Sequence, residues 1–252
     1  MYRPQFLLFG DSITQRSFQY GGWGAHLANA YQRKVDVLNR GYSGYNSRWA
    51  LQLLDRVLPE EKAGEILLAT VFFGANDAAL AERTSARQHV PLLEYRQNLR
   101  LIVLRLQRLR VQAIVLITPP PISEPDRVIH VEKQYGVKLD QPERTNAVTG
   151  QYAKACIELG QELGLPVLDL WSALQAEEGW QRGLLEDGLH LTQAGNQRVA
   201  QLLLKLIEQE FPKLRYSALP DDAPLNADID DKDPASSFQR FYAPKGARLE
   251  LA

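Results

Sequence analysis

A serine placed directly after a short apolar stretch is the first residue of this chain that could act as a nucleophile. Ser12 follows the apolar run 6–9 through Gly10 and Asp11 in FLLFGDSITQ. A serine hydroxyl reacts slowly until a neighbouring base accepts its proton. Taken alone, such a serine is more often part of a turn or a helix cap. A catalytic interpretation therefore requires that the chain also supply a base.

Of the four histidines, His190 has the most informative surroundings, in EDGLHLTQAG. Asp187 precedes it by three residues, so one turn of backbone would bring this carboxylate to the imidazole Nδ1 and leave Nε2 free to face Ser12. An Asp-x-x-His segment in front of a helix is also a common capping arrangement. If His190 is not the base, the candidates are His26, His89 and His130.

Two further stretches place a glycine and polar residues where a strand should end. In VFFGAND the run ends at Gly74, and Asn76 carries an amide that can donate two hydrogen bonds. In LNRGYSGYNS, Gly44 would allow a backbone N–H to approach a ligand closely. Acyl transfer requires donors directed at a developing oxyanion. Asn76 and Gly44 are candidates for that role.

These residues all follow segments that read as buried strands. The apolar and β-branched runs predict strands at 5–10, 35–40, 66–73, 113–118 and 166–170. Helical periodicity predicts helices at 92–110, 143–163 and 193–210, the last capped by Thr192. Alternating strands and helices predict an α/β fold with a parallel sheet, and ligands bind such sheets at the carboxyl ends of the strands.

Four short segments, FGDSIT, the Gly44 loop, GAND and DGLH, resemble in order the four sequence blocks of the SGNH, or GDSL-type, hydrolases. The stretches GGWGAHL, RGYSGYNSRWAL and DGLHLTQAG look most similar to the isoamyl acetate-hydrolysing esterase branch and its plant members. One departure is that the first block reads GDSI. The resemblance covers about residues 5–212 and implies a three-layer α/β/α, flavodoxin-like fold.

The resemblance also implies a serine esterase that hydrolyses carboxylic esters, with short acyl or acetyl groups expected and a role in lipid metabolism. It implies Ser12 as nucleophile, His190 as base and Asp187 as the residue that orients the base. The Ser12 N–H, Gly44 and Asn76 would form the oxyanion hole. No metal or other cofactor is expected. Asp11 is expected to hydrogen-bond the loops that hold Gly44 and Asn76, Asp77 is expected to have a similar supporting role, and neither is expected to be catalytic.

Two alternatives remain open at this point. The acyl group could pass to an alcohol other than water, which would make the protein an acyltransferase. The glycine and serine cluster could instead hold the phosphate of a flavin or nucleotide in a binding module. The chain contains neither a G-x-x-x-x-G-K-[ST] nor a G-x-G-x-x-G motif, and a phosphate site would not require Asp187 and His190.

Composition narrows the class of protein further. The 252 residues are 45% hydrophobic and carry a formal net charge of −1, so nucleic acid is not an expected partner. No apolar run approaches the roughly 20 residues of a membrane span. The single cysteine, Cys156, cannot form an internal disulfide. We expect a cytoplasmic enzyme that acts on a small-molecule ester. A homodimer is compatible with the sequence.

Two segments do not follow the strand–helix alternation. Residues 118–142 predict a long connection after the fourth strand, of a length that is often functional. Residues 215–252 form a polar, acidic extension of the 1–214 hydrolase domain and are expected to be partly extended or disordered. Four aromatic residues (Phe18, Trp23, Tyr45 and Phe73) could line an apolar pocket, although core positions are favoured for each.

Overall fold

A computed structural model describes residues 3–57, 66–136 and 138–243 of the chain. Its five-stranded sheet has the order β2-β1-β3-β4-β5, and every pair is parallel. The strands are β1 (Gln5–Gly10), β2 (Asp36–Gly41), β3 (Ile66–Phe72), β4 (Ala113–Ile117) and β5 (Val167–Leu168). This strand order is that of flavodoxin-like folds, so the predicted fold class is confirmed.

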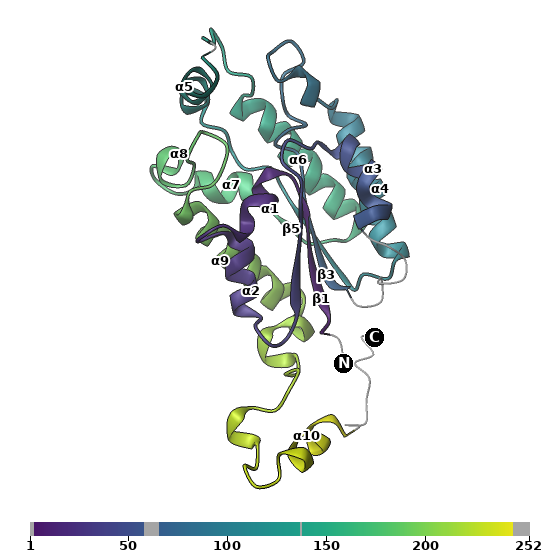
Figure 1. Ribbon diagram of the computed structural model, residues 1–252. Helices are drawn as coiled ribbons and strands as arrows, with labels where there is room; N and C mark the ends of the chain where they lie inside the picture. The colour runs from purple at the N-terminus through teal and green to yellow at the C-terminus, as the bar shows by residue number, and fades with distance from the viewer. Residues whose placement is uncertain (1–2, 58–65, 137, 244–252) are drawn as a thin grey trace.

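Helices cover both faces of the sheet (Figure 1). The α-helices are α1 (Ser12–Gln15), α2 (Trp23–Ala30), α3 (Ser47–Val57), α4 (Leu92–Arg108), α5 (Glu124–Tyr135), α6 (Asn146–Leu163), α7 (Leu170–Gln175), α8 (Trp180–Gly183), α9 (Gln193–Glu210) and α10 (Pro234–Tyr242). Short 3₁₀ turns are η1 (Arg16–Phe18), η3 (Ala86–Gln88), η4 (Pro212–Leu214), η5 (Tyr216–Ala218) and η6 (Asn226–Asp228). Helices α2, α7 and α9 contribute to one apolar core, and α3, α4 and α6 to the other.

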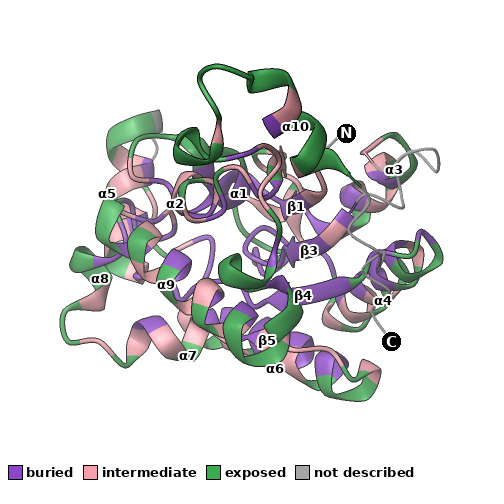
Figure 2. Cartoon of the chain, turned by 90° about the horizontal axis from the view of Figure 1, so that it is seen from below, coloured by how far each residue is buried: buried purple, intermediate pink, exposed green. Residues whose placement is uncertain are grey.

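The alternation of side chains along β1 shows why the sheet separates two cores. Phe6 and Leu8 point into the core under α2 and α9, whereas Leu7 and Phe9 point into the core under α3, α4 and α6. Successive side chains of a strand face opposite sides, so a strand buried on both sides is apolar throughout. Figure 2 shows the consequence, with buried strands at the centre and exposed residues on the outer helices.

The predicted element boundaries are mostly correct to within a few residues. The expected strand at 166–170 is the main exception, since only Val167–Leu168 pairs with β4. The strand stops there because the Asp169 side chain accepts a hydrogen bond from the Ser172 N–H and starts α7. Thr145 caps α6 in the same way, so this helix begins at Asn146 and not at 143. Thr192 caps α9 as predicted.

The connection expected at 118–142 contains a helix that was not predicted. Helix α5 has Pro125 in its first turn, and Gly136 ends it in the left-handed conformation. Ser123, the buried residue before this helix, contacts the loop of Gly188, since its N–H donates to the Gly188 carbonyl. The connection after β4 therefore packs against the DGLH segment, which contains Gly188.

Part of the C-terminal extension packs on the amino-end edge of the sheet. Leu214 and Leu219 belong to the core, and Lys34 on the loop before β2 donates to the Leu219 carbonyl. Asp222 pairs with Arg3 and Arg33. Packing continues past residue 214, since Leu219 and Pro224 are buried and Arg33 Nη2 donates to the Ala223 and Pro224 carbonyls.

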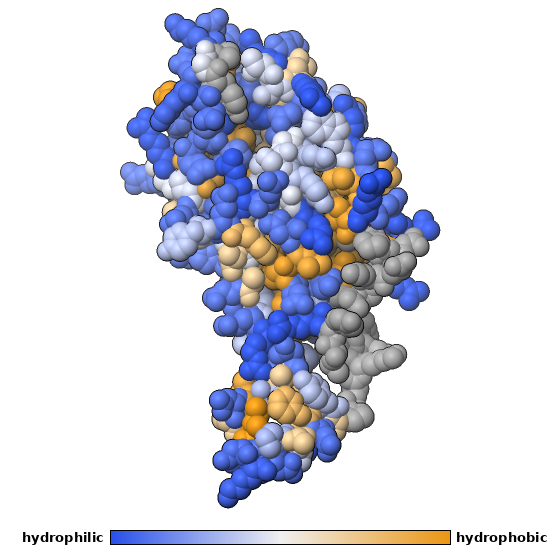
Figure 3. Space-filling view, in the orientation of Figure 1, coloured by the Kyte–Doolittle hydropathy of each residue, from blue (hydrophilic) through white to orange (hydrophobic). Residues whose placement is uncertain are grey.

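The rest of the described extension forms an arm. It carries η6 and α10 and extends below the sheet in Figure 1, and the space-filling view shows apolar side chains on its surface (Figure 3). Leu225 and Phe238 are among its exposed large side chains. Within the described part of the chain, no helix combines the length and apolar character needed to cross a bilayer.

Candidate active site

A serine, a histidine and an aspartate form a hydrogen-bonded line at the carboxyl edge of the sheet. Ser12 begins α1 directly after β1, and its Oγ lies 2.9 Å from His190 Nε2. His190 Nδ1 lies 2.7 Å from Asp187 Oδ2. An ionised carboxylate only accepts hydrogen bonds, so Nδ1 carries the proton and Nε2 faces the serine hydroxyl as an acceptor. The structure thus brings together the three residues expected to form a triad.

The loop that holds Asp187 and His190 is fixed by its own backbone. Asp187 Oδ1 accepts hydrogen bonds from the N–H groups of Leu189 and His190, at 2.9 and 2.7 Å. Gly188 between them has φ +78°, and a Cβ there would lie 2.5 Å from the Ser123 carbonyl oxygen. Only glycine fits this left-handed position against α5.

The electrostatic surroundings keep the Asp187 carboxylate ionised. Burial alone would raise its pKa, but the hydrogen bonds from His190 and the charge of Arg127 hold the pKa well below its usual range. Arg127 Nη1 lies 3.2 Å from Oδ2, the oxygen that also faces His190. The carboxylate is therefore available to orient the imidazole at neutral pH.

The two other expected site residues lie on the same cavity as Ser12 and His190. Gly44 has φ +78°, which favours glycine, and its carbonyl accepts from the Gln88 side chain at 3.0 Å. Asn76 is buried, and its Nδ2 donates to the Tyr45 carbonyl at 2.9 Å. An amide nitrogen has two hydrogens, so one remains for a ligand in the cavity.

Asp11 and Asp77 support the site in different ways. Asp11 Oδ1 accepts from the Ile13 N–H and so caps α1, and it does not tie the loops of Gly44 and Asn76 together as expected. Asp77 Oδ1 accepts from both the N–H and the hydroxyl of Ser47, which joins the end of β3 to the start of α3. Burial raises the pKa of Asp11 to about 7 and that of Asp77 to about 6.

Sequence patterns did not reveal a buried ionic cluster beneath the cavity. Its members are Arg127 on α5 and the adjacent Glu143 and Arg144 before α6, all at most 7% exposed. Glu143 Oε1 accepts from both arginines. His130 and Gln88 also line the cavity. These residues belong to no matched block, and a mainly polar stretch such as QPERT resembles an ordinary surface loop.

The cavity over Ser12 is polar. It has a volume of about 450 Å³, and its apolar side chains are Val131 and Leu189. Trp23 and Phe73 lie in the core instead, and Phe18 is exposed. A larger open groove of about 740 Å³ between α5 and α8 contains none of the expected site residues. Among the described residues, no group of His, Cys, Asp and Glu could hold a metal ion.

The fold and the site are those of a class of hydrolases, with a serine, a histidine and an aspartate hydrogen-bonded at the carboxyl edge of a parallel sheet. Comparisons with known proteins identify the family. Residues 8–198 match the model of the GDSL-like lipase/acylhydrolase family. The chain belongs to this family. The predicted family and the prediction of a carboxylic ester hydrolase are both confirmed.

Individual relatives support the same family. A GDSL esterase/lipase of Arabidopsis thaliana is 51% identical over 96% of this chain and 100% of its own length. An isoamyl acetate-hydrolyzing esterase 1 homolog of Bos taurus is 45% identical over 93% of this chain and 92% of its own. The crystal structure of a lipase/acylhydrolase from Enterococcus faecalis superposes with a TM-score of 0.64 at 26% identity, covering 82% of this chain and 96% of that one.

Proposed function

We propose that this protein hydrolyses small carboxylic esters through an acyl-enzyme on Ser12. The observation that carries the proposal is the line of short contacts from Ser12 Oγ to His190 Nε2 and from His190 Nδ1 to Asp187. This line satisfies the requirement of a nucleophile, a base and a group that orients the base.

In the first half of the reaction, His190 Nε2 accepts the Ser12 proton while Oγ attacks the ester carbonyl. The C–O bond to the alcohol then breaks, and His190 gives the proton to the departing alcohol oxygen. In the second half, His190 accepts a proton from water, and the hydroxide attacks the acyl carbon. The Ser12 oxygen leaves and regains its proton, and the carboxylic acid is released.

The oxyanion of each tetrahedral intermediate requires donors on the other side of the carbonyl. The Ser12 N–H has no intrahelical acceptor because Ser12 is the first residue of α1. The Gly44 N–H and the remaining hydrogen of Asn76 Nδ2 complete the set of donors. Donors of this kind stabilise the charge that develops in the transition state.

Labelling and substitution of Ser12 test this function. A serine-directed phosphonate should add its mass to the peptide that contains Ser12, and Ser12→Ala should reduce ester hydrolysis to background. Ser43 also lines the cavity and provides the matched control, Ser43→Ala, which should keep parent activity. Labelling at Ser43 or Ser17 would contradict the assignment of the nucleophile.

The small, polar cavity supports a preference for short acyl groups. An acyl chain of sixteen carbons would extend beyond this cavity of about 450 Å³, which offers two apolar side chains, Val131 and Leu189. Acetate and butyrate esters of p-nitrophenol should therefore react with higher kcat/KM than palmitate. A preference for chains above about ten carbons would contradict this proposal, because burial of each CH₂ contributes about 0.8 kcal/mol only where an apolar surface receives it.

Three expectations about the wider role of the protein stay predictions: a cytoplasmic location, a part in lipid metabolism and a homodimer. Sedimentation of the full chain at micromolar concentration would test the homodimer. Product analysis with an added alcohol would separate hydrolysis from acyl transfer, since an acyltransferase forms a new ester in place of the free acid.

A further inference from the structure

A chain of buried contacts connects the aspartate of the triad to the residues proposed for the oxyanion hole. Arg127 contacts Asp187 and donates to Glu143. Glu143 Oε1 also accepts from Arg144 Nη1 at 2.9 Å. Arg144, the last residue in this series of contacts, is 3% exposed. Its other donors point toward the end of β3 and toward η3.

Arg144 holds the segment that carries Asn76 at two points. Its Nε donates to the Ala75 carbonyl at 2.9 Å, and its Nη2 lies 3.3 Å from Asn76 Oδ1. Because Oδ1 faces a cation, the amide nitrogen must point the other way, toward the Tyr45 carbonyl. An amide rotated by 180° would direct its Nδ2 donors at the guanidinium and an acceptor oxygen at Tyr45.

Arg144 also reaches Gly44 through one intermediate side chain. Its Nη2 donates to Gln88 Oε1, and Gln88 Nε2 donates to the Gly44 carbonyl at 3.0 Å. A Cβ on Gly44 would lie 3.3 Å from Gln88 Nε2, so the two groups are closely packed. The position of the Gly44 peptide therefore depends on a residue that Arg144 fixes.

We propose that Arg144 is a positioning residue that sets two of the three oxyanion donors, Asn76 directly and Gly44 through Gln88. This inference rests on the proposed function, because it assumes that Asn76 and Gly44 bind the oxyanion. Arg144 itself need not touch the substrate. Its planar guanidinium serves four acceptors in fixed directions, whereas a lysine ammonium has three donors on a flexible stem.

The charge of Arg144 is balanced within the cluster. Burial lowers the pKa of Arg144, and the Glu143 carboxylate opposes this change. Burial would raise the pKa of Glu143, but Arg127 and Arg144 hold it below its usual value. Two arginines, Arg127 and Arg144, thus face two carboxylates, those of Glu143 and Asp187. Because the charges balance, Arg144 can remain a charged donor away from solvent.

A double-mutant cycle between Arg144 and Asn76 tests the proposal. Arg144→Lys should lower kcat by about 10- to 100-fold with KM within about threefold, because the donors are needed mainly in the transition state. Asn76→Ala should lower kcat by about 10²- to 10³-fold. Both changes disturb the Asn76 donor, whereas the effect of Arg144→Lys through Gly44 persists in the Asn76→Ala background. The double variant should therefore be about three- to tenfold faster than the product of the single effects predicts.

The outcomes separate the two proposals. If Asn76→Ala keeps parent kcat, the oxyanion assignment within the proposed function is wrong. If Asn76→Ala has its expected effect but the two effects multiply in full, Arg144 does not act through Asn76 and the inference fails. Parent kcat in Arg144→Lys would also overturn it.

A second variant and a control guard against misfolding. Gln88 is half-buried, so Gln88→Leu should fold and should lower kcat by about three- to tenfold through Gly44 alone. Where Arg144→Lys does not fold, parent kcat in Gln88→Leu overturns the proposal. Lys34→Met is the matched control, because it removes a buried, paired cation at the amino end of β2 and should leave kcat unchanged.

Discussion

At the scale of single residues, Asp187 contacts both the proposed base and the loop that carries it. One oxygen accepts two backbone N–H groups of its own loop, and the other faces His190 Nδ1 and Arg127. A change at this residue therefore alters the imidazole without removing either the nucleophile or the oxyanion donors.

Asp187→Asn should lower kcat by about 10⁴-fold, the scale known for the equivalent change in a serine triad. An asparagine Nδ2 that faces His190 Nδ1 would favour the imidazole tautomer with its proton on Nε2. In that tautomer Nε2 cannot accept the proton of Ser12. Steady-state kinetics and phosphonate labelling should decline together. Near-parent kcat would mean that another histidine is the base, and His130 would be tested first because it lines the same cavity.

Asp11 should make stability fall as pH rises through the weakly acidic range. Its pKa is about 7 in the folded protein against 3.8 for the free side chain, and among the described residues its Oδ2 accepts no hydrogen bond. Between these values the folded state keeps a proton that the unfolded chain has released. Raising the pH therefore favours unfolding, by about 2–4 kcal/mol for this group at pH 8 relative to pH 4.

Asp11→Asn removes this titration and should flatten the fall in stability between pH 4 and 7. Urea unfolding of the parent and the variant at pH 4.5 and pH 8 measures the difference. The slope should not vanish, because Asp77 also has a raised pKa, of about 6. Equal slopes for parent and variant would show that Asp11 is ionised in the folded protein at both pH values.

At the scale of elements, the loop between α8 and α9 depends on its contact with α5. The Ser123 N–H donates to the Gly188 carbonyl, and Arg127 on the next turn contacts Asp187. The geometry of the base is thus set by a helix from the connection after β4, a distant part of the chain.

Gly188→Ala should destabilise the protein by about 1–3 kcal/mol from its left-handed φ, and the clash with the Ser123 carbonyl should add to this cost. The clash should also move His190, so kcat should fall by at least about tenfold. Gly164→Ala is the matched control, because Gly164 has φ +63° with nothing within 4 Å of the place an added Cβ would take, so only the conformational cost applies. Equal kcat in both variants would contradict the proposed role of this contact.

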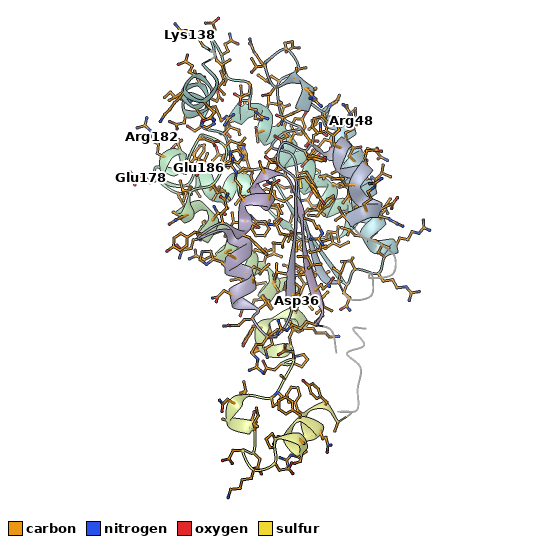
Figure 4. All side chains as sticks on the ribbon, in the orientation of Figure 1. Asp36, Arg48, Lys138, Glu178, Arg182 and Glu186 are labelled. Atoms are coloured by element: carbon orange, nitrogen blue, oxygen red, sulfur yellow. The ribbon has the colours of Figure 1, made fainter. Side chains whose placement is uncertain are left out.

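At the scale of the whole molecule, the site and the C-terminal extension lie at opposite ends of the sheet. Glu186, next to Asp187, lies in the upper part of Figure 4, and Asp36 at the start of β2 lies in the lower part, above the arm. The extension is held there by Arg3 and Arg33, which both pair with Asp222. Stability and catalysis should therefore be separable.

Asp222→Asn should lower the free energy of unfolding by about 1 kcal/mol, the scale of a partly exposed ion pair, with no change in kcat or KM. The pairing lowers the pKa of Asp222, so this stability is present above the ordinary pKa of an aspartate and is lost as the pH falls through the lowered value. Urea unfolding with and without 1 M salt measures it. A change in kcat would show that the packed part of the C-terminal extension is coupled to the site.

The sequence by itself determined the sheet, the family and the three residues of the proposed triad. Buried parallel strands require continuous apolar runs, and the short blocks around Ser12, Asn76 and His190 lie where those runs end. Local hydrogen bonds explain why the conformation of these segments can be predicted, since Asp187 binds its own loop and Thr192 caps its own helix.

The tertiary structure alone decided what surrounds these residues. Glu143 and Arg144 are adjacent in a polar loop, yet they meet Arg127 on α5, Asn76 after β3 and Gln88 on η3. No periodicity or spacing reports the contacts of Arg144 with residues 56 and 68 positions away, because they exist only once the chain is folded. The burial of these charges, the polar character of the cavity and the raised pKa of Asp11 have the same origin, since each depends on how much water the folded chain excludes.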